Sequence, residues 1–128
     1  MPGARHWYIP DAYLSSTGHG EQWPSHEAVC VLNRDEKEVQ LTFRFYYEDR
    51  DPIGDVTVSL AGQRCQHIRL DKPGHLNGVV LPKDVPYAIE LSASHDVIVQ
   101  YSRLDVTQPN FTLMTTIPFF DSASTKEA

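Results

Sequence analysis

The sequence has little of the features that would define a function at once. Its 128 residues include two cysteines, with no cysteine framework and no paired-cysteine metal spacing. Cys30 and Cys65 lie in segments expected to be strands, where cysteine is more typical as a small buried hydrophobe than as a reactive thiol. No apolar run approaches the roughly 18 to 20 residues of a spanning helix, and the first residues lack the apolar stretch of a signal peptide. We therefore expect a cytoplasmic protein with reduced cysteines that does not insert into a membrane.

Basic residues are also scarce. Eleven Lys and Arg stand against 17 Asp and Glu, which gives a formal net charge of -6. Binding to a nucleic-acid backbone needs a basic patch that displaces counterions. The charge balance therefore disfavours nucleic acid as a partner.

Catalytic and metal-binding motifs are missing as well. The six histidines show neither His-x-His spacing nor a His-Glu-x-x-His helix, and there is no Gly-x-Ser-x-Gly elbow or phosphate-binding glycine loop. The carboxylates Glu48, Asp49, Asp51 and Asp55 lack the positions of an EF-hand loop and are expected to form a solvated hairpin turn. We expect no enzyme, no cofactor and no transition metal.

What the sequence does contain is the two-residue period of half-buried strands. Residues 39–47 place Val39, Leu41, Phe43, Phe45 and Tyr47 on one face. Strands are also expected within 25–33, 56–60, 97–105 and 111–117, and turn residues separate these segments at intervals typical of a sandwich. The fold class is therefore all-β, a two-sheet antiparallel β-sandwich of about seven to eight strands. We expect one domain over residues 1–120, a long surface loop at 10–24 and a flexible C-terminal tail at 121–128.

Four groups of residues occur in the order found in a known family. They are Trp7 with Ser25 to Asn33; Tyr46, Tyr47, Asp49, Pro52 and Gly54; Arg64, His67 and Arg69; and Val99, Gln100, Arg103, Leu104 and Asp105. In these residues the sequence resembles the bacterial sensory rhodopsin transducer family, over about residues 7–117. It departs from the family pattern at Asp11-Ala12, where Glu-Gly is usual, and at Tyr101, where His is usual. A further departure is 105–108, where Asp-Ser-Arg-Gln is usual.

The resemblance implies a small β-sandwich protein that assembles into tetramers. It implies a non-enzymatic, cytoplasmic, oligomeric interaction or signalling protein. The expected partners are other copies of the chain, as a homotetramer, and a membrane photoreceptor or another signalling protein.

Seven charged, imidazole or phenolic side chains at expected strand ends are candidates for a binding site. They are Arg103, Asp105, Tyr101, His67, Arg69, His26 and Glu27. Tyr101, Arg103 and Asp105 lie on the same face of one strand. His67 and Arg69 share a face of another strand, whereas His26 and Glu27 point to opposite faces of theirs. Our hypothesis makes Arg103 a hub that is bonded to a carboxylate and faces a groove or subunit interface. The alternative is an ordinary ion pair at a strand end.

A second possible function is a carbohydrate-binding or other small-ligand module. Trp7, Tyr8, Tyr13 and Trp23 are expected in or near loops, where aromatic rings could stack on a sugar. A sugar is therefore the alternative partner.

Overall fold

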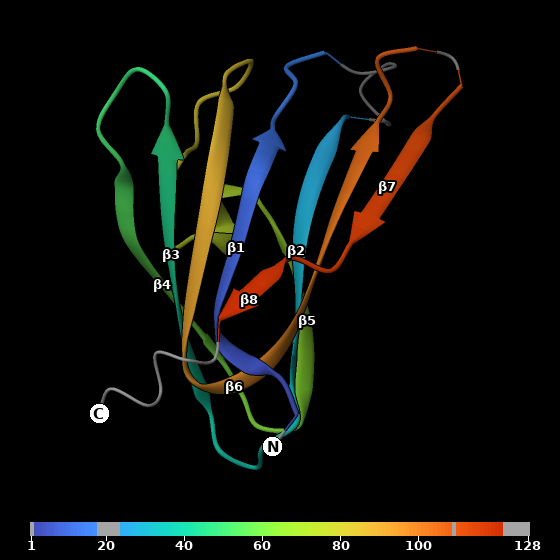
Figure 1. Cartoon of the computed structure of the whole chain (residues 1–128). Coiled ribbons are helices and arrows are strands. Elements are labelled where there is room, and N and C mark those ends of the chain that lie inside the picture. The colour runs from blue at the N-terminus through green and yellow to red at the C-terminus, as the bar shows by residue number, and fades with distance from the viewer. Residues whose placement is uncertain (1, 18–23, 109, 122–128) are drawn as a thin grey trace.

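The structure is a computed structural model that describes residues 2–17, 24–108 and 110–121, and these form an antiparallel β-sandwich (Figure 1). Its strands are β1 (Ala4–Tyr13), β2 (His26–Asn33), β3 (Val39–Tyr47), β4 (Ile53–Leu60), β5 (Arg64–Arg69), β6 (Pro86–Asp105), β7 (Thr112–Thr116) and β8 (Phe119–Asp121). A single 3-10 turn, η1 (Pro73–His75), lies between β5 and β6. The described residues contain no helix long and apolar enough to cross a membrane. The expected all-β fold is confirmed.

Strand β6 belongs to both layers of the sandwich. Its first half pairs with β1 and β3 in a layer ordered β4-β3-β6-β1-β8, and its second half pairs with β2 and β7 in a layer that β5 completes. The change of partners occurs between Ala93, which pairs with β3, and Ile98, which pairs with β2. Figure 1 shows β6 curving through the narrow end of the sandwich while the two layers diverge towards the other end. Both ends of β6 therefore lie at the wide end.

We call this wide end the open end. Tyr13 of β1 pairs with Pro86, Tyr47 of β3 pairs with Tyr87, and His26 of β2 pairs with Leu104. Residues far apart in the sequence are therefore neighbours at the open end.

The hydrophobic core lies between the two layers. Phe43 and Phe45 of β3 are fully buried from one layer, and Val29 of β2, Ile68 of β5 and Val99 of β6 are fully buried from the other. The odd residues of 39–47 were expected on one face, and the alternation of buried and exposed residues along β3 matches this. The strand expectation for 39–47 agrees with β3 at both ends.

Three expectations about the N-terminal and C-terminal segments need correction. Residues 10–13, expected in a surface loop, continue β1, while residues 18–23, including Trp23, lie outside the described part. Trp7, expected to be exposed, is buried at 3% because it points into the core, where its Nε1 donates to the carbonyl of Ala4 at 3.0 Å. Asp121, placed in the tail by sequence, is the last residue of β8, and residues 122–128 are outside the described part.

The cysteines lie on the outward face of the β2–β5 layer. Cys30 is half-buried and Cys65 is exposed, and both are free thiols. The expectation of buried cysteines was therefore wrong for Cys65, because its strand turns Ile68 and not Cys65 towards the core.

Asn33 joins the turns at the narrow end of the sandwich. It is fully buried, and its amide nitrogen donates to the carbonyls of Lys37 at 2.9 Å and Ala61 at 3.2 Å. Its amide oxygen accepts from the backbone N–H of Asp35 at 3.1 Å and contacts Nε2 of His95 at 2.9 Å. The side chain thus connects the β2–β3 turn, the β4–β5 turn and β6.

Replacing Asn33 by Ala should lower the free energy of unfolding by about 1 to 3 kcal/mol, because the substitution leaves buried backbone groups without partners. Urea unfolding followed by circular dichroism measures the change. Asn110→Ala, at an exposed position, is the matched control and should change stability by less than about 0.5 kcal/mol. Equal stabilities of the two variants would contradict this role for Asn33.

Candidate functional site

A buried carboxylate forms the centre of the site. Glu27 is fully buried on the core-facing side of β2. Its Oε1 accepts a hydrogen bond from the Tyr87 hydroxyl at 2.5 Å. Its Oε2 accepts from the backbone N–H of Tyr13 at 2.7 Å, from Nε of Arg103 at 3.2 Å and from the Tyr101 hydroxyl. A carboxylate needs hydrogen bonds of this kind to remain in a protein interior, because an unpaired buried charge is very unfavourable.

Arg103 connects this carboxylate to the surface. Its Nε also lies 3.3 Å from the Tyr101 hydroxyl, and its Nη2 donates to the carbonyl of Asp11 at 3.1 Å and to Asp11 Oδ1 at 3.4 Å. The Arg103 side chain is 24% exposed, whereas the Asp11 side chain is 90% exposed. The expected bond between Arg103 and a carboxylate is therefore present, and it joins β6 to β1 and β2.

The register of the strands explains why these side chains meet. Glu27 and Arg103 are direct partners in the β2–β6 ladder, and Tyr101 lies two residues before Arg103 on the same face. Tyr87 comes from the other half of β6 and reaches Glu27 across the core. The curvature of β6 therefore brings two tyrosines of one strand onto one carboxylate.

The two tyrosines are held in the neutral form. Burial, followed by the nearby Glu27 charge, raises the pKa of Tyr87 well above 10.0. The same two causes raise the pKa of Tyr101, although Arg103 opposes them. Both hydroxyls therefore stay protonated and donate to Glu27 at neutral pH.

One cavity at the open end lies beside Arg103. It has a volume of about 130 Å³. Its lining residues are Tyr13, Ser15, Ser25, His26, Arg103, Leu104, Asp105 and Thr107. Asp105 Oδ1 accepts from the backbone N–H of Thr107 at 2.9 Å and from its hydroxyl at 2.7 Å, and His26 Nδ1 lies 3.2 Å from the carbonyl of Pro24. Three of the predicted site residues, His26, Arg103 and Asp105, thus share one cavity.

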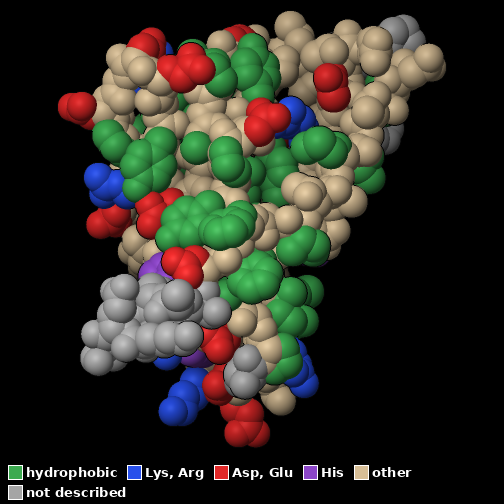
Figure 2. Space-filling view, in the orientation of Figure 1, with side chains coloured by type: hydrophobic (Ala, Val, Ile, Leu, Met, Phe, Trp, Pro, Cys, Tyr) green, Lys and Arg blue, Asp and Glu red, His purple; other side chains and the backbone are tan. Residues whose placement is uncertain are grey.

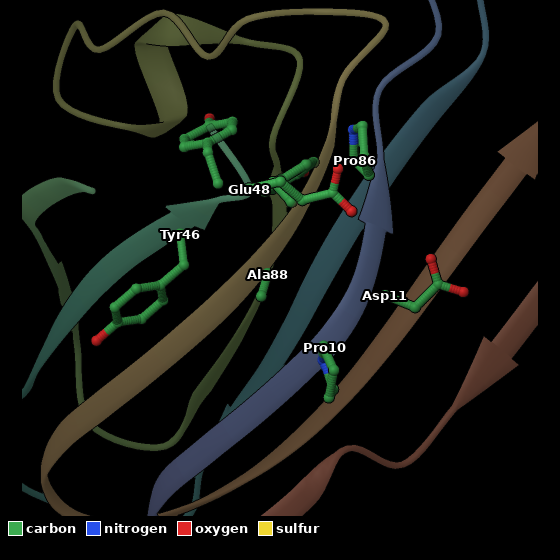
Figure 3. A pocket seen from close by; sticks show the side chains of 8 residues that line it. Pro10, Asp11, Tyr46, Glu48, Pro86 and Ala88 are labelled. Carbon is green, nitrogen blue, oxygen red and sulfur yellow. The ribbon is translucent and has the colours of Figure 1, made fainter. Parts of the chain in front are cut away.

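A second cavity, of about 220 Å³, lies on the β3 side of the same network (Figure 3). Its lining residues are Pro10, Asp11, Tyr46, Tyr47, Glu48, Pro86, Tyr87 and Ala88. Asp11 and Tyr87 belong both to this lining and to the bonds around Arg103 and Glu27. The hydrogen-bonded network therefore separates two cavities at the open end.

His67 and Arg69 do not join this cluster. They lie on β5 with their side chains away from the core, as their shared face predicted, while Ile68 between them is fully buried. Arg69 forms a two-pronged pair with Asp71, at 2.7 and 2.8 Å, and His67 lines a separate surface cavity with Cys30 and Cys65. These two residues reach the outer face because the strand period that buries Ile68 turns them outwards.

His26 and Glu27 point to opposite faces, as the sequence predicted. Glu27 enters the core, and His26 is half-buried at the surface. Sequence reasoning did not include Tyr87, Asp11 and Tyr13 in the site. Of these three residues, only Asp11 is marked in the sequence, because it stands where the sequence departs from the family pattern.

Protein donors occupy the acceptor positions of the Glu27 carboxylate. The oxygens of Glu27 already accept four hydrogen bonds, so the carboxylate is neither a free base nor a free metal ligand. Within the described residues, no group of three or more His, Cys, Asp or Glu side chains could hold a metal ion. Glu48, Asp49, Asp51 and Asp55 are all exposed, and Asp49 and Asp55 pair with Arg50 and Arg44.

The phenols of the network should make stability fall at alkaline pH. A tyrosine in an unfolded chain ionises at about pH 10, and the folded-state pKa values of Tyr87 and Tyr101 are raised above this value. The two tyrosines therefore make their full contribution to the free energy of unfolding below the unfolded-state pKa. This contribution is lost as the pH rises from there towards the folded-state pKa. Urea unfolding at a series of pH values from about 8 to about 11 measures this loss.

Tyr87→Phe and Tyr101→Phe should each lower stability at neutral pH by about 1 to 3 kcal/mol, and each should flatten the alkaline decline. Tyr13→Phe is the control, because Tyr13 contributes only its backbone N–H to Glu27. An alkaline decline equally steep in all three variants would contradict the assignment.

Comparison with known proteins places this geometry in a family. Residues 2–120 match the family described as Anabaena sensory rhodopsin transducer. The chain resembles the crystal structure of Thermotoga maritima 1070, with 35% identity, a TM-score of 0.84 and coverage of 95% of this chain and 98% of that one. It also resembles the Anabaena sensory rhodopsin transducer, with 29% identity, a TM-score of 0.71 and coverage of 80% and 90%. Comparison with curated protein sequences gives no significant match. With the family match spanning nearly all of its length, the chain belongs to the Anabaena sensory rhodopsin transducer family.

Proposed function

We propose that this protein is a non-enzymatic cytoplasmic signalling adaptor that binds a membrane photoreceptor, or another signalling protein, through the open end of its sandwich. The observation that carries this proposal is the Arg103–Glu27 network, which is buried on one side and reaches the surface between two cavities. A partner that contacts Arg103 would touch a side chain bonded directly to the buried Glu27, and a partner that contacts Asp11 would touch a side chain bonded to Arg103. Binding at this end is thereby coupled to the packing of the two layers.

The family supports the partner class, and the site supports the absence of catalysis. A structural neighbour of this chain is named a sensory rhodopsin transducer. The carboxylate at the centre of the site has its acceptor positions occupied by protein donors, so it serves as a structural anchor and not as an acid or base. Recognition at this end therefore relies on shape and surface charge.

We further propose that the protein acts as a closed homotetramer. An apolar surface lies over β7, β8 and the turn between them, where Met114, Ile117 and Phe119, between 41% and 69% exposed, line one surface cavity. Figure 2 shows hydrophobic side chains gathered across the middle of this face. Apolar surfaces of this kind mark interaction sites on globular proteins, and closed symmetry is the usual arrangement of identical copies. We call this surface the β7–β8 face.

The alternative of a sugar-binding module loses its main support. Trp7 is buried, and the ring of Tyr8 lies 6.1 Å from that of Phe119 in a tilted contact. Of the four aromatic residues expected to form a platform, Tyr13 is 38% exposed and lines the cavity beside Arg103, and Trp23 lies outside the described residues. We therefore propose a protein, and not a sugar, as the partner.

Arg103→Ala should weaken binding to a membrane photoreceptor by about 1 to 3 kcal/mol, because it leaves the buried Glu27 short of a donor at the binding end. The measurement is the affinity for a retinal-binding receptor from the same organism, reconstituted in lipid nanodiscs, at a temperature where the variant is folded. Arg69→Ala is the matched control, since Arg69 is similarly exposed at 22% and lies on the outer face of the same layer. Failure of the unmodified protein to bind, or an equal loss for both variants, would contradict the proposal.

Ile117→Glu should reduce the assembly to smaller species, because it places a charge in the proposed β7–β8 interface. Light scattering coupled to size-exclusion chromatography gives the mass. The unmodified protein is expected at four times the mass of one chain. Val80→Glu changes an apolar residue outside this face that is 70% exposed, against 61% for Ile117, and should leave the mass unchanged. A monomer mass for the unmodified protein would exclude the assembly.

A further inference from the structure

The second cavity at the open end has a chemistry that the proposed function does not use. We propose that this cavity, lined by Tyr46, Tyr47, Asp11 and Glu48, binds the cationic side chain of a basic peptide segment, Arg or Lys, carried by a partner protein. The inference deepens the proposed function and rests on it for the identity of that partner. We call the cavity the tyrosine cavity.

The walls of the tyrosine cavity are aromatic and apolar. Tyr47 stacks on Tyr87 with their ring centroids 5.8 Å apart and an interplanar angle of 21°, and Pro10 and Pro86 complete the lining. The exposed ring of the lining is that of Tyr46, which is 38% exposed, whereas the Tyr47 ring is already in contact with Tyr87 and Arg50. An exposed tyrosine ring attracts a cation placed against it, and a planar guanidinium also stacks on it. The chain itself shows this contact, because the Arg44 guanidinium lies 5.8 Å from the centroid of the Tyr46 ring.

The charges around the tyrosine cavity are unbalanced. Glu48 and Asp11 lie on different sides of it (Figure 3). Arg103, the cation that reaches Asp11, is already shared with the buried Glu27, and Glu48 has no ion-pair partner among the described residues. A cation entering the cavity would therefore meet the Glu48 carboxylate, which is unpaired within the described part of the chain, and the Asp11 carboxylate, whose cation Arg103 is shared with Glu27.

The neighbouring arginines do not reverse this imbalance. Arg50, whose guanidinium lies 5.5 Å from the Tyr47 ring centroid, pairs with Asp49 at 3.0 Å, and Arg44 pairs with Asp55 at 3.4 Å. Figure 2 shows acidic side chains gathered along the upper, open end of the molecule. The whole chain is acidic too, with a formal net charge of -6. Charge complementarity therefore selects a cationic occupant over an anionic one.

The size of the cavity and the class of partner agree with this occupant. A volume of about 220 Å³ suits a side-chain head group with part of its stem, and not a folded element. The cytoplasmic loops of membrane proteins carry an excess of Lys and Arg. A membrane receptor would thus present a suitable segment on the side where we place the adaptor.

The test uses the 128-residue chain and a short synthetic peptide with a central arginine. A peptide of the same sequence with citrulline in that position keeps the shape of the side chain and removes its charge. Titrations followed by two-dimensional NMR should show shifts of the amides of Tyr46, Tyr47, Glu48 and Ala88 with the arginine peptide. The citrulline peptide should bind at least several-fold more weakly, and added salt should weaken the arginine peptide.

Glu48→Gln and Asp11→Asn should each weaken the arginine peptide by roughly two- to five-fold, which is the size expected for an exposed charge pair. Both carboxylates lie at the surface, so both variants should fold. Asp96→Asn is the matched control, because it removes the same charge from a residue that pairs with Arg5 and does not line the cavity. It should leave the affinity unchanged.

Equal binding of the arginine and citrulline peptides would overturn the inference, as would equal losses for Glu48→Gln and Asp96→Asn. The absence of shifts around the cavity would also overturn it. These outcomes are separate from the receptor experiment. Binding of the peptide without binding of a photoreceptor would support the cavity and remove the proposed partner, whereas receptor binding unaffected by Glu48→Gln would remove the cavity from the recognition surface.

Discussion

The structure depends on keeping one carboxylate satisfied inside the sandwich. Glu27 is fully buried, and a charge in that position is tolerated only because hydroxyl, backbone and guanidinium donors surround it. Those donors come from β1 and from both halves of β6. The two layers must therefore be placed correctly relative to each other before Glu27 can be buried. Burial of this carboxylate thus depends on the packing of the whole domain.

The curvature of β6 makes this arrangement possible. A single 20-residue strand contributes Tyr87 to one layer and Tyr101 and Arg103 to the other. The strand turns at the narrow end, so both of its ends and the cavities between them lie at the open end (Figure 1). The same feature that joins the layers thus also builds the proposed recognition surface, and the apolar β7–β8 face is the separate surface that we propose for contact with other copies.

Much of the fold could be read from local pattern. The alternation along 39–47 and the turn residues between the apolar segments predict the sandwich, because a strand has a fixed two-residue period and each strand must bury one face. The local sequence pattern gave the wrong structure for residues 10–13 and the wrong exposure for Trp7. There the sequence has turn-forming and aromatic residues that local rules place in a loop, but pairing with β6 continues the strand and buries the ring.

For the site, the sequence determined which residues carry charge and which face of a strand each one occupies. The two-residue period alone places Arg103, Tyr101 and Asp105 on one face of their strand and His26 and Glu27 on opposite faces of theirs. Tertiary structure alone decided that Glu27 is the carboxylate that binds Arg103, that Tyr87 and Asp11 join them, and that His67 and Arg69 stay apart. The physical reason is that a strand's period fixes direction locally, whereas partners across the sandwich depend on register and on the curvature of β6, which no local segment encodes.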